Sequence, residues 1–124
     1  MEITIIGTGK MAHGIATRAL AGGHAVTLLG EDAQQANALA GELPGDVHTG
    51  VAGDPLAGDV AVLAVPYAAV SQVLAQYAGQ LGDKVVVEIT NPVDFSSMTP
   101  LGIEAGSAAQ EAAQIGRASC RERV

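Results

Sequence analysis

The stretch "IIGTGKMA" constrains the fold more than any other part of the chain. An apolar run, Ile3 to Ile6, stops at Gly7, and Gly9 follows before a segment that suits a helix. Together with Ala12, the two glycines fit the pattern G-x-G-x-x-[GA] at a strand-to-helix turn. In that pattern the first glycine permits a tight turn, the second lets a pyrophosphate approach the backbone, and the small third residue lets the helix pack close to the sheet.

Apolar runs and helical stripes alternate along the rest of the chain. The run Asp59–Pro66 is apolar without alternation, as in a central parallel strand that is covered on both faces. Strands joined by short helices cross over right-handed, which predicts an α/β chain with a Rossmann-type doubly wound parallel sheet. The predicted strands are Ile3–Ile6, Val26–Leu29, Val47–Val51, Asp59–Pro66 and Lys84–Ile89.

Three helices are predicted from apolar residues at helical spacing. Gly22 and Gly23 end the first helix, and Asp32 with Gln35 three positions later can cap the second. The predicted apolar faces are Met11, Ala12, Ile15, Ala16 and Ala19, then Ala36, Leu39, Ala40 and Leu43, then Val70, Val73, Leu74, Tyr77 and Leu81.

Composition and charge exclude several classes of partner. Hydrophobic residues make up 48% of the chain, but there is one Phe and no Trp, so the core must consist of Val, Ile, Leu and Ala. The net charge of −7 argues against nucleic acid and membrane surfaces, which are themselves anionic. No apolar run is long enough to span a bilayer, and the N-terminus has no signal peptide, so we expect a cytoplasmic protein. Cys120 stands alone, and no metal site is predicted.

The last ten residues, "IGRASCRERV", differ in composition from the rest and resemble the conceptual translation of a common DNA-sequencing adapter. We therefore expect residues 1–114 to be the native dinucleotide-binding domain and residues 115–124 to be non-native. Ser107 with Gln110 forms a capping box, so a helix is expected to start there and to be interrupted. The sheet is then truncated at its C-terminal edge, which leaves Val85, Val86, Val87 and Ile89 as an apolar edge.

Placed between a strand and a helix, the glycine pattern predicts a dinucleotide site. The free N–H groups at the helix N-terminus would hold the phosphates. The same pattern is also compatible with glycines kept only for a tight packing turn, and with a methyl-donor site of the methyltransferase kind. His13, in the first turn of the helix, is interpreted as a solvated surface group, and Glu88 as half exposed.

Three blocks in order, "ITIIGTGKMAHGIATRALAGGHAVTLLG", "GDVAVLAVPYAAV" and "VVVEITNPVDF", resemble the NADP-binding domain of the deazaflavin-dependent NADP oxidoreductase family, the NADPH-dependent reductases of coenzyme F420. More distantly, they resemble pyrroline-5-carboxylate reductase. The first resemblance implies an oxidoreductase that transfers hydride between NADP(H) and an 8-hydroxy-5-deazaflavin. It also implies a homodimer when the protein is full length. Because the cofactors carry this chemistry, no catalytic residue is predicted.

The resemblance also implies which residues hold the cofactor. The turn after the first strand would hold the pyrophosphate, the end of the fourth strand would lie along the nicotinamide, and "ITNP" would close the crevice from the fifth strand. The cofactor-binding residues implied are Gly7, Thr8, Gly9, Lys10, Met11, Ala12, Gly30, Glu31, Asp32, Ala64, Val65, Pro66, Asn91 and Pro92.

The kind of dinucleotide is left open by the sequence. Members of the family commonly place Ser or Thr and then Arg after the glycine that ends the second strand, where they grip the 2′-phosphate of NADP. Here Glu31 and Asp32 stand at those places, and two carboxylates repel a phosphate dianion and suit a ribose hydroxyl. Lys10 and Thr8 could still supply a cation and a donor, so NADP(H) is favoured narrowly and NAD(H) stays possible. Alternative functions are a non-catalytic nucleotide-sensing module and a fragment of a pyrroline-5-carboxylate-type imine reductase.

Overall fold

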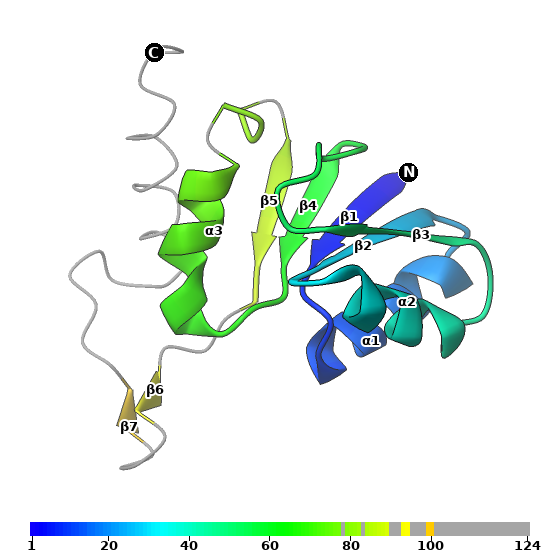
Figure 1. Ribbon diagram of the computed structural model, residues 1–124, viewed down its shortest axis with the longest axis horizontal. Coiled ribbons are helices and arrows are strands. Elements are labelled where there is room, and N and C mark those ends of the chain that lie inside the picture. Colours follow the sequence, from blue (N-terminus) through cyan, green and yellow to red (C-terminus); the bar gives the residue numbers. More distant parts are fainter. Residues whose placement is uncertain (78, 83, 90–92, 95–98, 101–124) are drawn as a thin grey trace.

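Five parallel strands form the framework of the chain in a computed structural model, which describes residues 1–77, 79–82, 84–89, 93–94 and 99–100 (Figure 1). They lie side by side in the order β3-β2-β1-β4-β5. The five predicted strands and the parallel sheet are therefore confirmed, although the fourth is shorter than its apolar run. The strands are β1 (Glu2–Ile6), β2 (Ala25–Gly30), β3 (Val47–Val51), β4 (Val60–Leu63) and β5 (Val85–Glu88).

The helices lie on both faces of this sheet. The helices α1 (Lys10–Ala21) and α2 (Ala33–Gly41) pack on one face, over β1, β2 and β3. The helix α3 (Val70–Gln76), preceded by the short 3₁₀ helix η1 (Tyr67–Ala69), covers the other face near β4 and β5 (Figure 1). This is the doubly wound arrangement that the sequence predicts.

Neighbouring residues of each strand point to opposite faces and so enter two separate cores. Ile5 belongs to the core under α1 and α2, whereas Ile6 belongs to the core under α3. Most of each predicted apolar face is confirmed, because Ala12, Ala16 and Ala19, Ala36, Leu39 and Leu43, and Val70, Leu74 and Tyr77 are all buried. Met11 is a correction, since it is 59% exposed, and Leu81 lies beyond the end of α3. One expectation about composition needs correction: Tyr77, an aromatic residue, is among the largest fully buried side chains.

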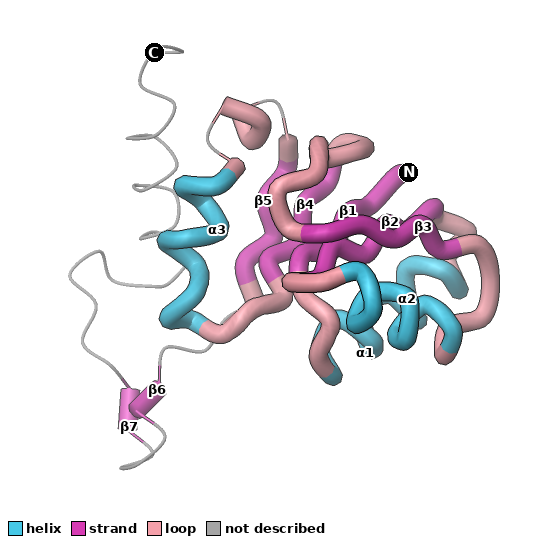
Figure 2. The backbone as a smooth tube through the Cα atoms, in the orientation of Figure 1, coloured by secondary structure: helices cyan, strands magenta, loops and turns pink. Residues whose placement is uncertain are grey.

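The connection from β3 to β4 contains no helix and crosses the sheet as a loop (Figure 2). Side chains from distant elements hold it. The Tyr77 hydroxyl accepts a hydrogen bond from the Gly53 N–H at 2.8 Å, and Gln80 Oε1 accepts one from the Leu56 N–H at 3.0 Å. On the β1 side, Thr4 Oγ1 donates to the Ala57 carbonyl at 2.7 Å. The loop is therefore tied to both α3 and β1.

Burial and charge act together on Tyr77. Desolvation raises the pKa of its hydroxyl, the hydrogen bond from Gly53 lowers it, and the nearby Asp54 carboxylate raises it further, with a net rise. Asp54 is itself fixed, because its Oδ2 accepts from the Val51 N–H at 3.0 Å.

Two further short strands, β6 (Val93–Asp94) and β7 (Thr99–Pro100), pair antiparallel in a sheet of their own. Glu88 is half-buried, as expected. The predicted helix start at Ser107, the site residues Asn91 and Pro92 and the adapter-like tail lie outside the described residues. Among the residues described, no helix is long and apolar enough to cross a bilayer.

Candidate functional site

The turn after β1 lies directly against the end of β4. Gly7 has φ of +130°, a conformation that L side chains rarely adopt, and a Cβ there would stand 2.0 Å from the Ala64 carbonyl oxygen. Its N–H donates to the Leu29 carbonyl at 2.9 Å. Gly7 is thus required by the backbone and by packing, as the sequence pattern predicts for the first glycine.

Gly9 shows the opposite behaviour. Its φ is −84°, which any residue adopts, and a Cβ there would meet no atom within 4 Å. Neither backbone strain nor packing within the described residues requires a glycine at this position. A tight packing turn therefore accounts for Gly7 and does not account for Gly9.

The N-terminus of α1 is open to an anion. Gly9 is its N-cap residue, no side chain of the described residues caps it, and its first turn contains no acidic residue. The N–H groups of a helix start carry partial positive charge and favour phosphate. Ala12 is fully buried, so its side chain serves the packing of α1 on the sheet and only its backbone can reach a ligand.

The turn after β2 touches the turn after β1. A Cβ on the buried Gly30 would stand 3.0 Å from Thr8 Cγ2 and 3.0 Å from the Asp32 carbonyl oxygen. Thr8 Oγ1 in turn donates to Gln35 Oε1 at 3.4 Å. The predicted cap is confirmed, since Asp32 Oδ1 accepts from the Gln35 N–H at 2.8 Å, but the Gln35 side chain turns to Thr8. Glu31 is exposed beside them.

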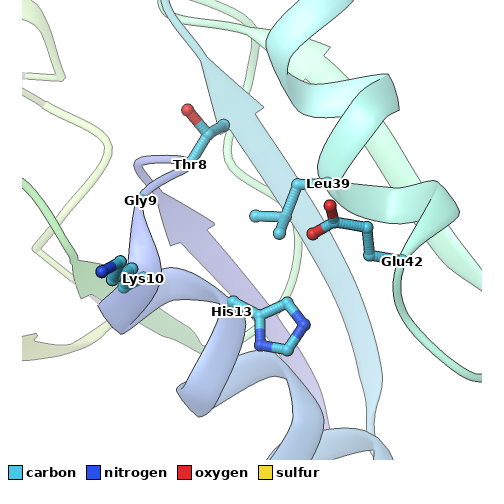
Figure 3. A pocket seen from close by; sticks show the side chains of 6 residues that line it. All are labelled: Thr8, Gly9, Lys10, His13, Leu39 and Glu42. Atoms are coloured by element: carbon cyan, nitrogen blue, oxygen red, sulfur yellow. The ribbon is translucent and has the colours of Figure 1, made fainter.

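A pocket of about 330 Å³ lies between α1 and α2, next to these turns (Figure 3). Three of its residues come from the predicted site, and three were not predicted. His13 is half-buried here and extends from α1 toward the groove, so its interpretation as a solvated surface group is wrong in part. The lining residues are Thr8, Gly9, Lys10, His13, Leu39 and Glu42.

Lys10 stands on the boundary between two hollows. In Figure 3 its side chain points away from α2, and it also lines a second hollow of about 560 Å³ on the other flank of α1. Met11, 59% exposed, belongs to that second hollow. Lys10 therefore lines both hollows, whereas Met11 lines only the second one.

The end of β4 completes the described part of the site. Ala64 and Val65 are half-buried and Pro66 is exposed. The Pro66 carbonyl accepts from the Ala69 N–H at 2.9 Å, which starts η1. Ile89, which follows β5, packs against the core under α1 and so lies near this edge. The carboxyl ends of parallel strands next to the β1–β4 boundary are where open α/β sheets bind ligands.

Comparison with known proteins agrees with this geometry. The family model described as "NADP oxidoreductase coenzyme F420-dependent" matches residues 2–92. The F420-dependent NADP reductase of Methanothermobacter thermautotrophicus is 35% identical over 128 residues, an alignment that covers 93% of this chain and 55% of that protein. The chain therefore spans about half the length of this curated relative.

Two solved structures share the fold. One, from Arthrobacter sp. FB24 and assigned as an F420-dependent NADP reductase, superposes with a TM-score of 0.78 at 24% identity, over 92% of this chain and 57% of that one. The other, pyrroline-5-carboxylate reductase from Coxiella burnetii, superposes with a TM-score of 0.62 at 23% identity, over 77% of this chain and 37% of that one. Both resemblances inferred from the sequence are thereby confirmed at the level of the fold.

Proposed function

We propose, because this chain belongs to the family of coenzyme F420-dependent NADP oxidoreductases, that it is the dinucleotide-binding part of an enzyme that passes hydride between a nicotinamide dinucleotide and a deazaflavin. The observation that carries this proposal is Gly9. Within the described part of the chain, neither its φ nor its packing requires a glycine here, and no side chain caps the helix that starts at this point. A phosphate that approaches the backbone at this point supplies the missing reason for it.

The described residues fit the phosphate part of such a cofactor. The pyrophosphate would lie over the turn Thr8–Gly9 and take its hydrogen bonds from the first N–H groups of α1. The nicotinamide would extend toward Ala64, Val65 and Pro66, which Gly7 brings next to the same turn. Exposed Pro66 and half-buried Val65 offer an apolar surface for one ring face.

The chain's own part in the reaction is positional. The cofactors supply the hydride chemistry when they are bound. The turn after β1 fixes the phosphates, and the end of β4 excludes water from the nicotinamide. The sheet keeps these two parts of the site at a fixed distance from each other. The curated relative has nearly twice the length of this chain. We therefore propose that the contacts to the hydride acceptor are made by the whole protein and not by this chain alone.

The proposal is tested in two steps. Titration of the chain with NADPH and NADH, followed by the fluorescence of the reduced nicotinamide, should show saturable binding of at least one of them. The chain contains no Trp, which keeps the protein's own fluorescence low. A longer version of the gene should then oxidise NADPH or NADH with a deazaflavin acceptor and not with unrelated acceptors. Absence of binding to both nucleotides would contradict the proposal.

A further inference from the structure

We infer that Glu31 recognises the unphosphorylated adenosine ribose, so that this chain takes NAD(H) in preference to NADP(H). The inference rests on the proposed function and concerns one end of the same site. The family's dinucleotide is NADP, and the residues after β2 do not fit its 2′-phosphate. The disagreement is local, since the phosphate turn and the end of β4 do fit a dinucleotide.

Glu31 is held next to the phosphate turn by the backbone before it. Gly30 is buried and lies so close to Thr8 that a Cβ would stand 3.0 Å from Thr8 Cγ2. The next residue, Glu31, is exposed at the carboxyl end of β2. An acidic side chain at this position of a doubly wound sheet accepts hydrogen bonds from the ribose hydroxyls.

The start of α2 already carries a negative charge. Asp32 caps the helix through its carboxylate, which accepts from the Gln35 N–H at 2.8 Å and places a negative charge at the helix N-terminus. The Thr8 hydroxyl, beside this turn, donates to Gln35 Oε1. A 2′-phosphate here would meet the carboxylates of Glu31 and Asp32, which repel it.

The cations of the described residues stand elsewhere. Lys84 donates to the Gly58 carbonyl, beside the start of β1 and at the opposite edge of the sheet. Arg18 lies in the last turn of α1, the end remote from the phosphate turn. Lys10 is at the correct edge, but its side chain points away from α2 (Figure 3). Within the described part of the chain, Lys10 is therefore the one Lys or Arg at this edge of the sheet, and its side chain points away from α2.

The test is a set of paired fluorescence titrations with NADH and NADPH at low ionic strength. The wild-type chain should bind NADH roughly tenfold or more tightly than NADPH, because one nucleotide gains a charge-assisted hydrogen bond and the other meets two like charges. Glu31→Gln should weaken NADH binding and strengthen NADPH binding, so that the preference largely disappears. Asp32→Asn keeps a good helix cap while it removes the charge, and should strengthen NADPH binding alone.

Glu2→Gln is the matched control, because Glu2 is an exposed carboxylate at the opposite end of the sheet. It changes the net charge as Glu31→Gln does and should leave the preference between the two nucleotides unchanged. The dependence of the preference on ionic strength is an independent test. A rise in ionic strength screens the repulsion between the 2′-phosphate and the two carboxylates, so the ratio of NADPH to NADH dissociation constants should fall. If cations held the 2′-phosphate instead, salt would weaken NADPH binding more than NADH binding, and the same ratio would rise.

Each outcome decides something. Tighter binding of NADPH than NADH by the wild-type chain, or an unchanged preference in Glu31→Gln, overturns the inference and leaves the proposed function standing. Failure to bind either nucleotide overturns the proposed function and the inference with it.

Discussion

Gly7 and Gly9 are two residues apart in one motif, and the structure gives them different tasks. Gly9→Val should abolish nucleotide binding, because the branched side chain would enter the open space above the helix start. Stability should fall by no more than about 1 kcal/mol, since the residue's φ suits valine and only a modest N-cap preference is lost. Thermal unfolding and NADH titration of the same preparation measure both effects.

Gly7→Ala is the contrasting variant. Its Cβ would stand 2.0 Å from a backbone oxygen at positive φ, so it should destabilise the chain by several times the change in Gly9→Val. Equal unfolding midpoints for the two variants would show that the division of tasks is wrong. Retained NADH affinity in Gly9→Val would remove the phosphate site from this turn.

Glu31 and Asp32 allow a gain of affinity at the residue scale. Glu31→Ser with Asp32→Arg should raise the affinity for NADP(H) relative to NAD(H), because a guanidinium–phosphate contact contributes about 1.5–3 kcal/mol. The same change removes the cap on α2 and should lower stability by about 1 kcal/mol. Titrations of both cofactors and a melting curve on the double variant measure the two effects. An unchanged preference would locate the discrimination elsewhere.

At the scale of elements, the hydroxyl of Tyr77 joins the β3–β4 loop to the end of α3. Tyr77→Phe leaves the Gly53 N–H without this acceptor and should cost about 1–3 kcal/mol of the free energy of unfolding. It also removes a pH dependence. The pKa of Tyr77 is raised above 10 in the folded chain, so its contribution is complete below about pH 10 and is lost as pH rises through the raised value.

Urea unfolding of wild type and Tyr77→Phe at neutral and alkaline pH tests this role. The free energy of unfolding of the wild type should fall more steeply than that of the variant above pH ~10, so that the difference between the two free energies becomes smaller. A difference in stability that stays constant from about pH 7 to about pH 11 would mean that folding does not raise the pKa of this hydroxyl.

At the scale of the whole molecule, the strand β5 is an apolar edge strand of the main sheet, as far as the structure describes the chain. Among the described residues β5 has a neighbour only in β4, and Val85 and Val87 are 63% and 38% exposed. Unprotected edges of this kind pair with other chains. We expect concentration-dependent self-association in sedimentation velocity experiments. The variant Val87→Lys should reduce this self-association, because a charged side chain on an edge strand disfavours pairing with another chain. Monomeric sedimentation of the wild-type chain at high concentration would contradict this view of the edge.

The whole chain also allows a test of its last ten residues, which the sequence predicts to be non-native. If the prediction holds, deletion of residues 115–124 should change neither the unfolding midpoint nor the nucleotide affinity, because a non-native tail has not been selected to pack against the domain. Thermal unfolding and NADH titration of the shortened chain provide the comparison. A fall of several degrees in the midpoint would show that the tail contributes to the fold.

The sequence by itself determined the five strands of the main sheet and the three helices, though not η1, β6 or β7, because the signals of the former are local. Runs of apolar residues marked the strands, helical spacing marked the buried faces of the helices, and Asp32 with Gln35 marked a cap that the structure contains. Strands that alternate with helices, apart from the direct connection of the third strand to the fourth, were enough to predict a parallel, doubly wound sheet. Even the turn at Gly7 followed from a short local pattern of glycines and a small residue.

The tertiary structure decided which residues meet, because those contacts join parts of the chain that no local pattern connects. It gave the strand order β3-β2-β1-β4-β5, and it placed Gly7 against Ala64 while leaving Gly9 in open space. His13 could have been predicted in the site, since it is one helical turn beyond Gly9. Leu39 and Glu42 could not, because they reach the pocket only when α2 packs beside α1. The hydrogen bond between Gly53 and Tyr77 spans 24 positions, and only the folded sheet brings its donor and acceptor together.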